Sequence, residues 1–78
     1  MEMNEFIENI LDQFDERPTE KVTPQTNHHE IEGWTSMIAL SVMAMIDEEY
    51  EVQIKANEMR DSKSIQELYD IVNSYLEK

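Results

Sequence analysis

The feature that most constrains the fold is a nearly unbroken apolar run from Met37 to Ile46, in which Ser41 is the one polar residue. Its length and its alanine and methionine content favour a helix over a buried strand. A helix that is apolar on all sides is either wholly buried or presents its outer face to a partner. Because a chain of 78 residues builds only one modest core, it cannot enclose such a helix completely. The sequence therefore predicts a helix over about 36–49 whose outer face is a candidate docking surface.

An amphipathic pattern precedes this run. Apolar residues at helical spacing predict a helix from Met3 to about Glu16. Arg17-Pro18 is expected to end it, because the residue before a proline is pushed out of the helical region. Residues 17–34 then form a long connection in which only Val22 and Ile31 look anchored to a core. Loops of this length without secondary structure are uncommon and often functional.

The C-terminal third predicts two further helices. Asn57 could cap a single helical turn over 58–61. Ser64 opens the last helix, and Glu67 stands three residues on, as in a capping box. We therefore expect an all-α bundle of three main helices plus one short helix, with a long loop after the first helix.

Charge and composition limit the classes of function. Eighteen acidic and six basic residues give a net charge of −12, which argues against binding nucleic acid or an anionic membrane surface. Such charge favours docking onto basic patches of other proteins, although solubility alone would also explain it. There is no cysteine, and no apolar stretch approaches the roughly 20 residues that span a bilayer. The start lacks the basic region of a secretory signal. We expect one domain over residues 1–78, monomeric and cytoplasmic.

Ser36 stands at the mouth of the apolar helix. If Thr35 is its N-cap, Ser36 lies in the first turn, beside backbone N–H groups that lack partners and at the positive end of the helix dipole. Such a position binds anions, so a phosphodiester built on Ser36 would be held by those amides. The alternative is that Ser36 merely helps to cap the helix.

The run Gly33-Trp34-Thr35-Ser36-Met37 is followed by an apolar-then-acidic stretch from Ala44 to Tyr50, a connector with Val52 and Ile54, and the predicted last helix. Together with the acidity and the long first loop, these segments resemble an acyl carrier protein. In that family Asp-Ser-Leu opens the second helix and its serine carries 4′-phosphopantetheine; here Thr35-Ser36-Met37 match. The resemblance implies that Ser36 carries the arm, whose thiol would hold an acyl group as a thioester, and that the chain is a carrier and no enzyme.

The resemblance also implies partners. A phosphopantetheinyl transferase would install the arm, and acyl-transferring or ketoacyl synthase enzymes with basic patches would dock on the second helix. The expected contact residues are Thr35, Met37, Ile38, Leu40, Ser41, Ala44, Met45, Asp47 and Glu48.

Three positions depart from the family. Thr35 replaces its aspartate, which removes a charge where the transferase would dock, and Ile38 and Ser41 stand where the exposed face is often acidic. These changes suggest a narrower set of partner enzymes than fatty-acid synthesis requires. The resemblance itself suggests specialised carriers that serve surface-polysaccharide or secondary-metabolite pathways. Thr35 in place of aspartate also leaves open an interaction module that keeps the fold and is never modified.

Other candidate sites are weaker. His28-His29 lie in a loop without further metal ligands, so we interpret them as solvated histidines. No metal site is expected either at the acidic residues Asp47, Glu48, Glu49 and Glu51, because they lack calcium-loop spacing. A hydrolytic triad of Ser36, a histidine and Asp47 lacks the G-x-S-x-G pattern, and we assign no catalytic residue. Two roles stay open, those of Trp34 (loop packing or partner contact) and of Met37, Met43 and Met45 (core or docking face).

Overall fold

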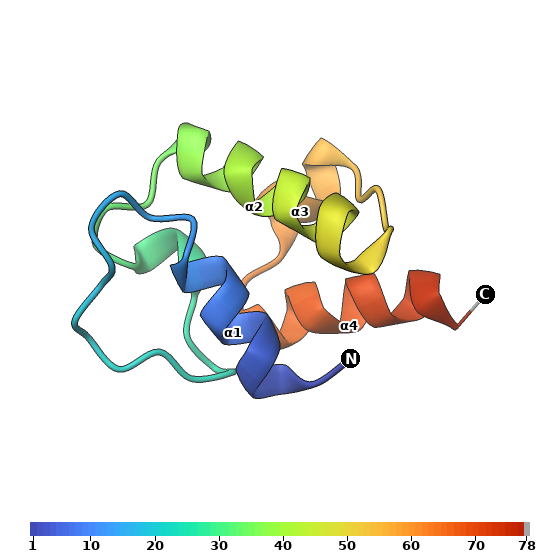
Figure 1. Ribbon diagram of the computed structural model, residues 1–78, viewed down its shortest axis with the longest axis horizontal. Coiled ribbons are helices and arrows are strands. Elements are labelled where there is room, and N and C mark those ends of the chain that lie inside the picture. Colours follow the sequence, from blue (N-terminus) through green and yellow to red (C-terminus); the bar gives the residue numbers. More distant parts are fainter. Residues whose placement is uncertain (78) are drawn as a thin grey trace.

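The structure is a computed structural model that describes residues 1–77. As predicted, its secondary structure is helical, with no strand in this range. The elements in chain order are α1 (Met3–Leu11), the short 3-10 helix η1 (His28–Glu30), α2 (Ser36–Tyr50), α3 (Ala56–Asp61) and α4 (Ile65–Leu76) (Figure 1). None of the helices in residues 1–77 combines the length and hydropathy that a bilayer crossing requires.

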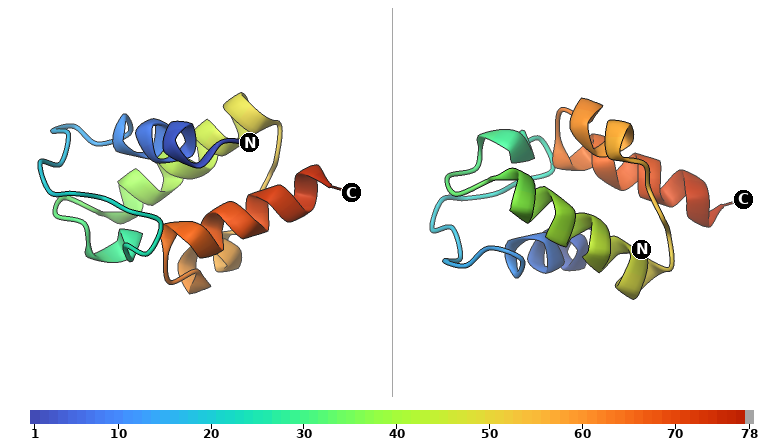
Figure 2. Two further views of the ribbon diagram at one scale, coloured as in Figure 1. Left: turned by 90° about the horizontal axis from the view of Figure 1, so that it is seen from below. Right: turned by 90° about the horizontal axis from the view of Figure 1, so that it is seen from above.

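The helices form a small bundle that the long loop closes at one end (Figures 1 and 2). Helix α1 contacts both α2 and α4, and α3 packs on α4. Every α-helix contributes to one hydrophobic core. Its fully buried apolar side chains are Phe6, Ile10, Val42, Ile46, Ile65, Leu68 and Val72. Because Val42 and Ile46 are buried in this core, the rotation of α2 about its axis is fixed. That rotation decides which residues of α2 are exposed.

Helix α1 is shorter than predicted, because it ends at Leu11 and not near Glu16. Beyond it, the Gln13 N–H donates to the Ile10 carbonyl at 3.0 Å and the Phe14 N–H to the Leu11 carbonyl at 3.2 Å. This tighter i→i+3 pairing keeps Phe14 on the apolar side, where its buried ring packs on Trp34. The apolar spacing is the same for both geometries, so the sequence could not place the end.

The start of α3 and one capping contact of α4 differ from prediction by a residue or two. Helix α3 begins at Ala56, with Lys55 in the N-cap position where we expected Asn57, because the Glu58 carboxylate accepts the Lys55 N–H at 2.8 Å. Ser64 caps α4 as predicted, and its Oγ accepts the Glu67 N–H at 3.1 Å. The Glu67 carboxylate, however, accepts from the N–H of Lys63, one residue earlier than a capping box requires.

The long loop is fastened to α4. The N–H groups of Ile65 and Gln66, in the first turn of α4, donate to the carbonyls of Thr26 and Pro24 at 3.0 and 2.8 Å. The loop thus satisfies two donors that a helix start would otherwise leave unpaired. Ile31 is buried, as expected of a core anchor. These bonds hold η1, and the segment that leads into α2, against the C-terminal half of the chain.

Candidate functional site

Ser36 is the first residue of α2, and it is exposed. Thr35 is the N-cap, as predicted: its Oγ1 accepts the Ile38 N–H at 3.2 Å and its carbonyl accepts the Ala39 N–H at 3.0 Å. Within residues 1–77, no acceptor faces the backbone N–H groups of Ser36 and Met37. The first turn of α2 contains no acidic side chain that would repel an anion. Its open donors and the positive end of the helix dipole therefore suit a phosphate bonded to Ser36.

The cap at Thr35 gives a direct test of this geometry. Thr35→Ala should lower the free energy of unfolding by about 1 kcal/mol, because it removes the acceptor of the Ile38 N–H. Thr35→Asp should match or exceed the wild type, since a carboxylate both caps and favours the helix N-terminus. Urea denaturation of the three proteins measures the difference. Equal stability of Thr35→Ala and the wild type would show that the cap contributes nothing.

The segment before Ser36 is held by aromatic packing. Gly33 has φ +94°, a backbone conformation that disfavours residues with a Cβ atom. The half-buried Trp34 ring then lies 6.0 Å from the Phe14 ring and 5.2 Å from the His28 ring, centroid to centroid. Trp34 therefore packs over the loop, which answers the question that the sequence left open about its role. This packing fixes the backbone segment that leads to Ser36.

His28 contradicts the interpretation of a solvated loop histidine, because its side chain is fully buried. The Ser62 hydroxyl donates to the Met59 carbonyl at 3.0 Å, so it accepts from His28 Nε2–H at 3.2 Å. Nδ1 is then the bare ring nitrogen, and it is buried without a hydrogen-bond partner. Burial, with a smaller contribution from the neighbouring His29, lowers the pKa of His28 from 6.5 to about 4. A pair of histidines in a polar loop has no periodicity, so the sequence held no signal of this burial.

The surroundings of the two histidines are hydrogen-bond partners and aromatic rings. His29 is half-buried, and its Nε2 lies 3.0 Å from the Ser62 carbonyl oxygen. Residues 1–77 contain no group of three or more histidine, aspartate or glutamate side chains placed to hold a metal ion. The imagined hydrolytic triad is not assembled either: Asp47 stands eleven positions after Ser36 in α2, about 16 Å along the helix axis.

The outer face of α2 is partly the predicted one. Met37 is 70% exposed and Leu40 61% exposed. The other predicted contact residues that are exposed or half-exposed are Thr35, Ser41, Ala44, Asp47 and Glu48. Ile38 and Met45, at 7% and 6% exposure, were wrongly placed on this face. They lie on the buried stripe with Val42 and Ile46, because 3.6 residues per turn puts positions i, i+4, i+7 and i+8 on one side.

The C-terminal end of α2 concentrates negative charge. Asp47, Glu48 and Glu49 are exposed in the last turn, which contains no basic residue. Glu51 follows as the C-cap with φ +57°, a left-handed conformation that non-glycine residues rarely adopt. Carboxylates near the negative end of a helix dipole each cost about 0.3–1 kcal/mol. The carboxylates at this end of α2 therefore lower the stability of the fold.

Comparison with known proteins bears on the same residues. The sequence model of the family described as the phosphopantetheine attachment site matches residues 5–72, a range that includes Ser36 and the outer face of α2. No curated protein matches the chain. Domains of this family carry 4′-phosphopantetheine covalently on a serine and are carriers that catalyse no reaction. The match covers most of the chain, and the exposed serine at a helix start fits the group, so the chain belongs to the phosphopantetheine attachment site family.

Proposed function

We propose that Ser36 is the serine that carries 4′-phosphopantetheine in this chain. The support is its hydroxyl, exposed at the start of a fifteen-residue helix whose first N–H groups are open. The other serines suit the role less well. Ser41 is half-buried within α2; the hydroxyls of Ser62 and Ser64 are held in hydrogen bonds; and the Ser74 hydroxyl donates to the Ile71 carbonyl beyond the matched range.

The chemistry at Ser36 follows from what surrounds it. Coenzyme A would supply the arm: a bond forms between Ser36 Oγ and phosphorus while the bond from phosphorus to the nucleotide portion breaks. The hydroxyl proton passes to a base of the transferase, since no side chain of residues 1–77 forms a hydrogen bond with Ser36. The N–H groups of Ser36 and Met37 then stabilise the phosphodiester charge. When bound, the arm supplies the thiol that holds an acyl group as a thioester.

Partner enzymes are proposed to dock on the outer face of α2. Met37, Leu40 and Ala44 form an exposed apolar strip, and Asp47 and Glu48 add negative charge at its end. A basic patch on an acyl-transferring or ketoacyl synthase enzyme would relieve the repulsion among these carboxylates, which gives salt-sensitive association. Because the strip is apolar near Ser36, it favours a narrow set of partners, as in the specialised pathways that the sequence suggested.

The same proposal includes the organisation of the chain. Residues 1–78 would act as one carrier domain, because the core draws on all four α-helices. We keep the cytoplasmic location as part of the proposal. A net charge of −12 opposes association between copies, which supports a monomer.

Intact-mass measurement tests the proposal. The purified chain, incubated with coenzyme A, Mg²⁺ and broad-specificity transferases, should gain the mass of one phosphopantetheinyl group, and fragmentation should locate it on Ser36. The alternative is an interaction module that is never modified. It would gain no mass with several transferases, and the protein purified from its own host would be unmodified while bound to a partner.

A further inference from the structure

An open groove lies beside Ser36, between the loop that follows α1 and the N-terminal half of α2. Its volume is about 650 Å³. Thr35 and Met37, the two neighbours of Ser36, line it from α2, and residues 13–20 line it from the loop. Met37, at 70% exposure, is its most accessible apolar residue, while Phe14 and Ile38 line it with only 7% of their surface exposed. Ser36 itself does not line the groove, but a molecule seated there would contact Thr35 and Met37, the residues before and after it.

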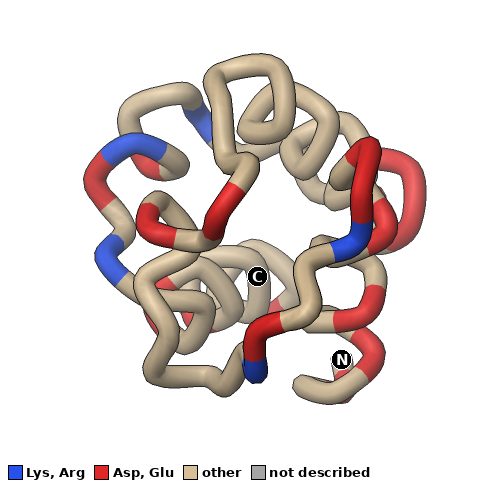
Figure 3. Tube along the Cα trace, turned by 90° about the vertical axis from the view of Figure 1, so that its left-hand side faces the viewer, with Lys and Arg blue, Asp and Glu red and all other residues tan. Residues whose placement is uncertain are grey.

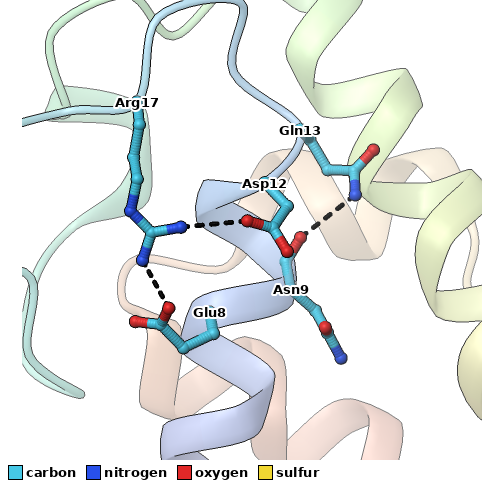
Figure 4. A network of polar contacts seen from close by, with 5 residues as sticks. All are labelled: Glu8, Asn9, Asp12, Gln13 and Arg17. Atoms are coloured by element: carbon cyan, nitrogen blue, oxygen red, sulfur yellow. Dashed lines mark hydrogen bonds and ion pairs between the residues drawn. The ribbon is translucent and has the colours of Figure 1, made fainter.

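The lining of the groove is strongly acidic. Its acidic members are Asp15, Glu16, Glu20 and Glu32, and its one basic member is Arg17. The Arg17 guanidinium is turned to α1, where Nη1 lies 2.9 Å from Asp12 Oδ1 and Nη2 pairs with Glu8 (Figure 4). Seen from the loop end, acidic positions also predominate over basic ones along the backbone (Figure 3). Arg17 is therefore already neutralised elsewhere, and the groove keeps its negative charge.

This charge selects among occupants. A phosphodiester on Ser36 is itself anionic, so the carboxylates disfavour laying the arm in the groove. A second copy of this chain would bring a net charge of −12 and meet the same repulsion. A protein segment with lysine or arginine beside an apolar side chain matches both the rim and the apolar surface.

The loop segments that line the groove supply negative charge near the N-terminal end of α2, which has none of its own. The first turn of α2 has no acidic residue, so the negative charge beside Ser36 comes from the groove. Glu20 and Glu32 are held together there, since Glu20 Oε1 accepts the Glu32 N–H at 3.1 Å. Both side chains are exposed, so a partner can reach them.

We propose that this groove receives a basic segment, anchored by an apolar side chain, of the transferase that modifies Ser36, and that Glu20 and Glu32 are the groups that attract it. The inference rests on the proposed modification of Ser36. It extends the docking surface beyond the outer face of α2 to the loop after α1.

The test compares Glu20→Gln/Glu32→Gln with a matched pair, Asp61→Asn/Asp70→Asn, which removes two charges from exposed positions on α3 and α4. Glutamine at position 20 keeps an oxygen that accepts the Glu32 N–H. In low salt, the groove variant should lose about fivefold to tenfold in the kcat/KM of the transferase, measured by intact mass, and the matched pair less than about twofold. High salt should remove the difference.

Two other results of this experiment would contradict the groove proposal, and they can be told apart. If the wild type is modified and the groove variant is modified as fast as the matched pair, the groove proposal alone fails. If the wild type is never modified, the proposed function of Ser36 fails, and the groove proposal fails with it. Amide chemical shifts give a second readout. Shifts of residues 13–20 on loading without a partner would assign the groove to the arm, and shifts that grow with protein concentration would assign it to a second copy.

Discussion

Ser36→Ala is expected to abolish the mass gain completely, whichever transferase and salt concentration are used. The reason is covalent: alanine has no oxygen to bond to phosphorus. The fold should persist, since Ser36 is exposed at the first position of α2 and its side chain makes no hydrogen bond with another residue of 1–77. The free energy of unfolding should stay within about 0.5 kcal/mol of the wild type, as for most surface substitutions. Intact mass and urea denaturation measure the two quantities.

The matched control is Ser74→Ala, which removes an exposed serine hydroxyl near the end of α4, outside the range that the family model matches. This variant should gain mass as the wild type does. A mass gain in Ser36→Ala would place the attachment on another residue and overturn the proposed site.

Acidification should destabilise the protein through His28. Its pKa is about 4 in the folded state and 6.5 in the unfolded state, so the unfolded chain binds the proton more readily. The stabilisation is therefore complete above pH 6.5 and is lost as the pH falls toward 4. It amounts to about 3 kcal/mol, since each pKa unit corresponds to about 1.4 kcal/mol. The cause is structural: a proton on Nδ1 would create a buried charged donor without an acceptor.

The test compares the wild type with His28→Gln, a substitution chosen from the groups that surround His28. His29 and Glu67 act on it electrostatically, the first lowering and the second raising its pKa, while Ser62 and Trp34 are neutral neighbours. His28→Gln keeps a side-chain N–H that can donate to Ser62 Oγ and does not titrate. Urea denaturation between pH 7 and pH 4 should show that the wild type loses about 3 kcal/mol more than His28→Gln.

Carboxylate protonation is common to both proteins, so it cancels in this difference. His29→Gln serves as the control, because it removes the neighbouring histidine and leaves the buried one. Since burial lowers the pKa of His28 more than His29 does, most of the wild-type pH dependence should remain. Parallel curves for the wild type and His28→Gln would show that the buried ring does not resist protonation.

The helical content and the start of α2 could be predicted from sequence because they depend on local physics. A capping threonine before a long apolar run marks a helix start, whatever the rest of the chain does. The same holds for Ser64 at the start of α4. Helix ends and the side-chain contacts of helix caps were predicted less accurately. The end of α1 and the pairing of Glu67 with Lys63 depend on turns whose alternatives have the same residue spacing.

Which residues of α2 are exposed depends on the tertiary structure. In a run that is apolar on all sides, the sequence contains no contrast from which to read the buried stripe. Packing against the rest of the core buries Ile38 and Met45 and leaves Met37 and Leu40 outside. The expected exposure of Ile38 and Met45 was therefore wrong, although the helix and its exposed outer side were correctly expected.

The sequence by itself determined that this acidic chain folds as a helical domain with a serine at the start of an apolar helix. These features follow from spacing and capping, which act over a few residues, while the carrier role was implied by the resemblance to a known family and is supported by the family match. Only the tertiary structure decided that His28 is buried, that Trp34 packs over the loop, and that carboxylates line a groove beside Ser36. Each of these depends on contacts between segments far apart in the chain, and residue spacing does not encode such contacts.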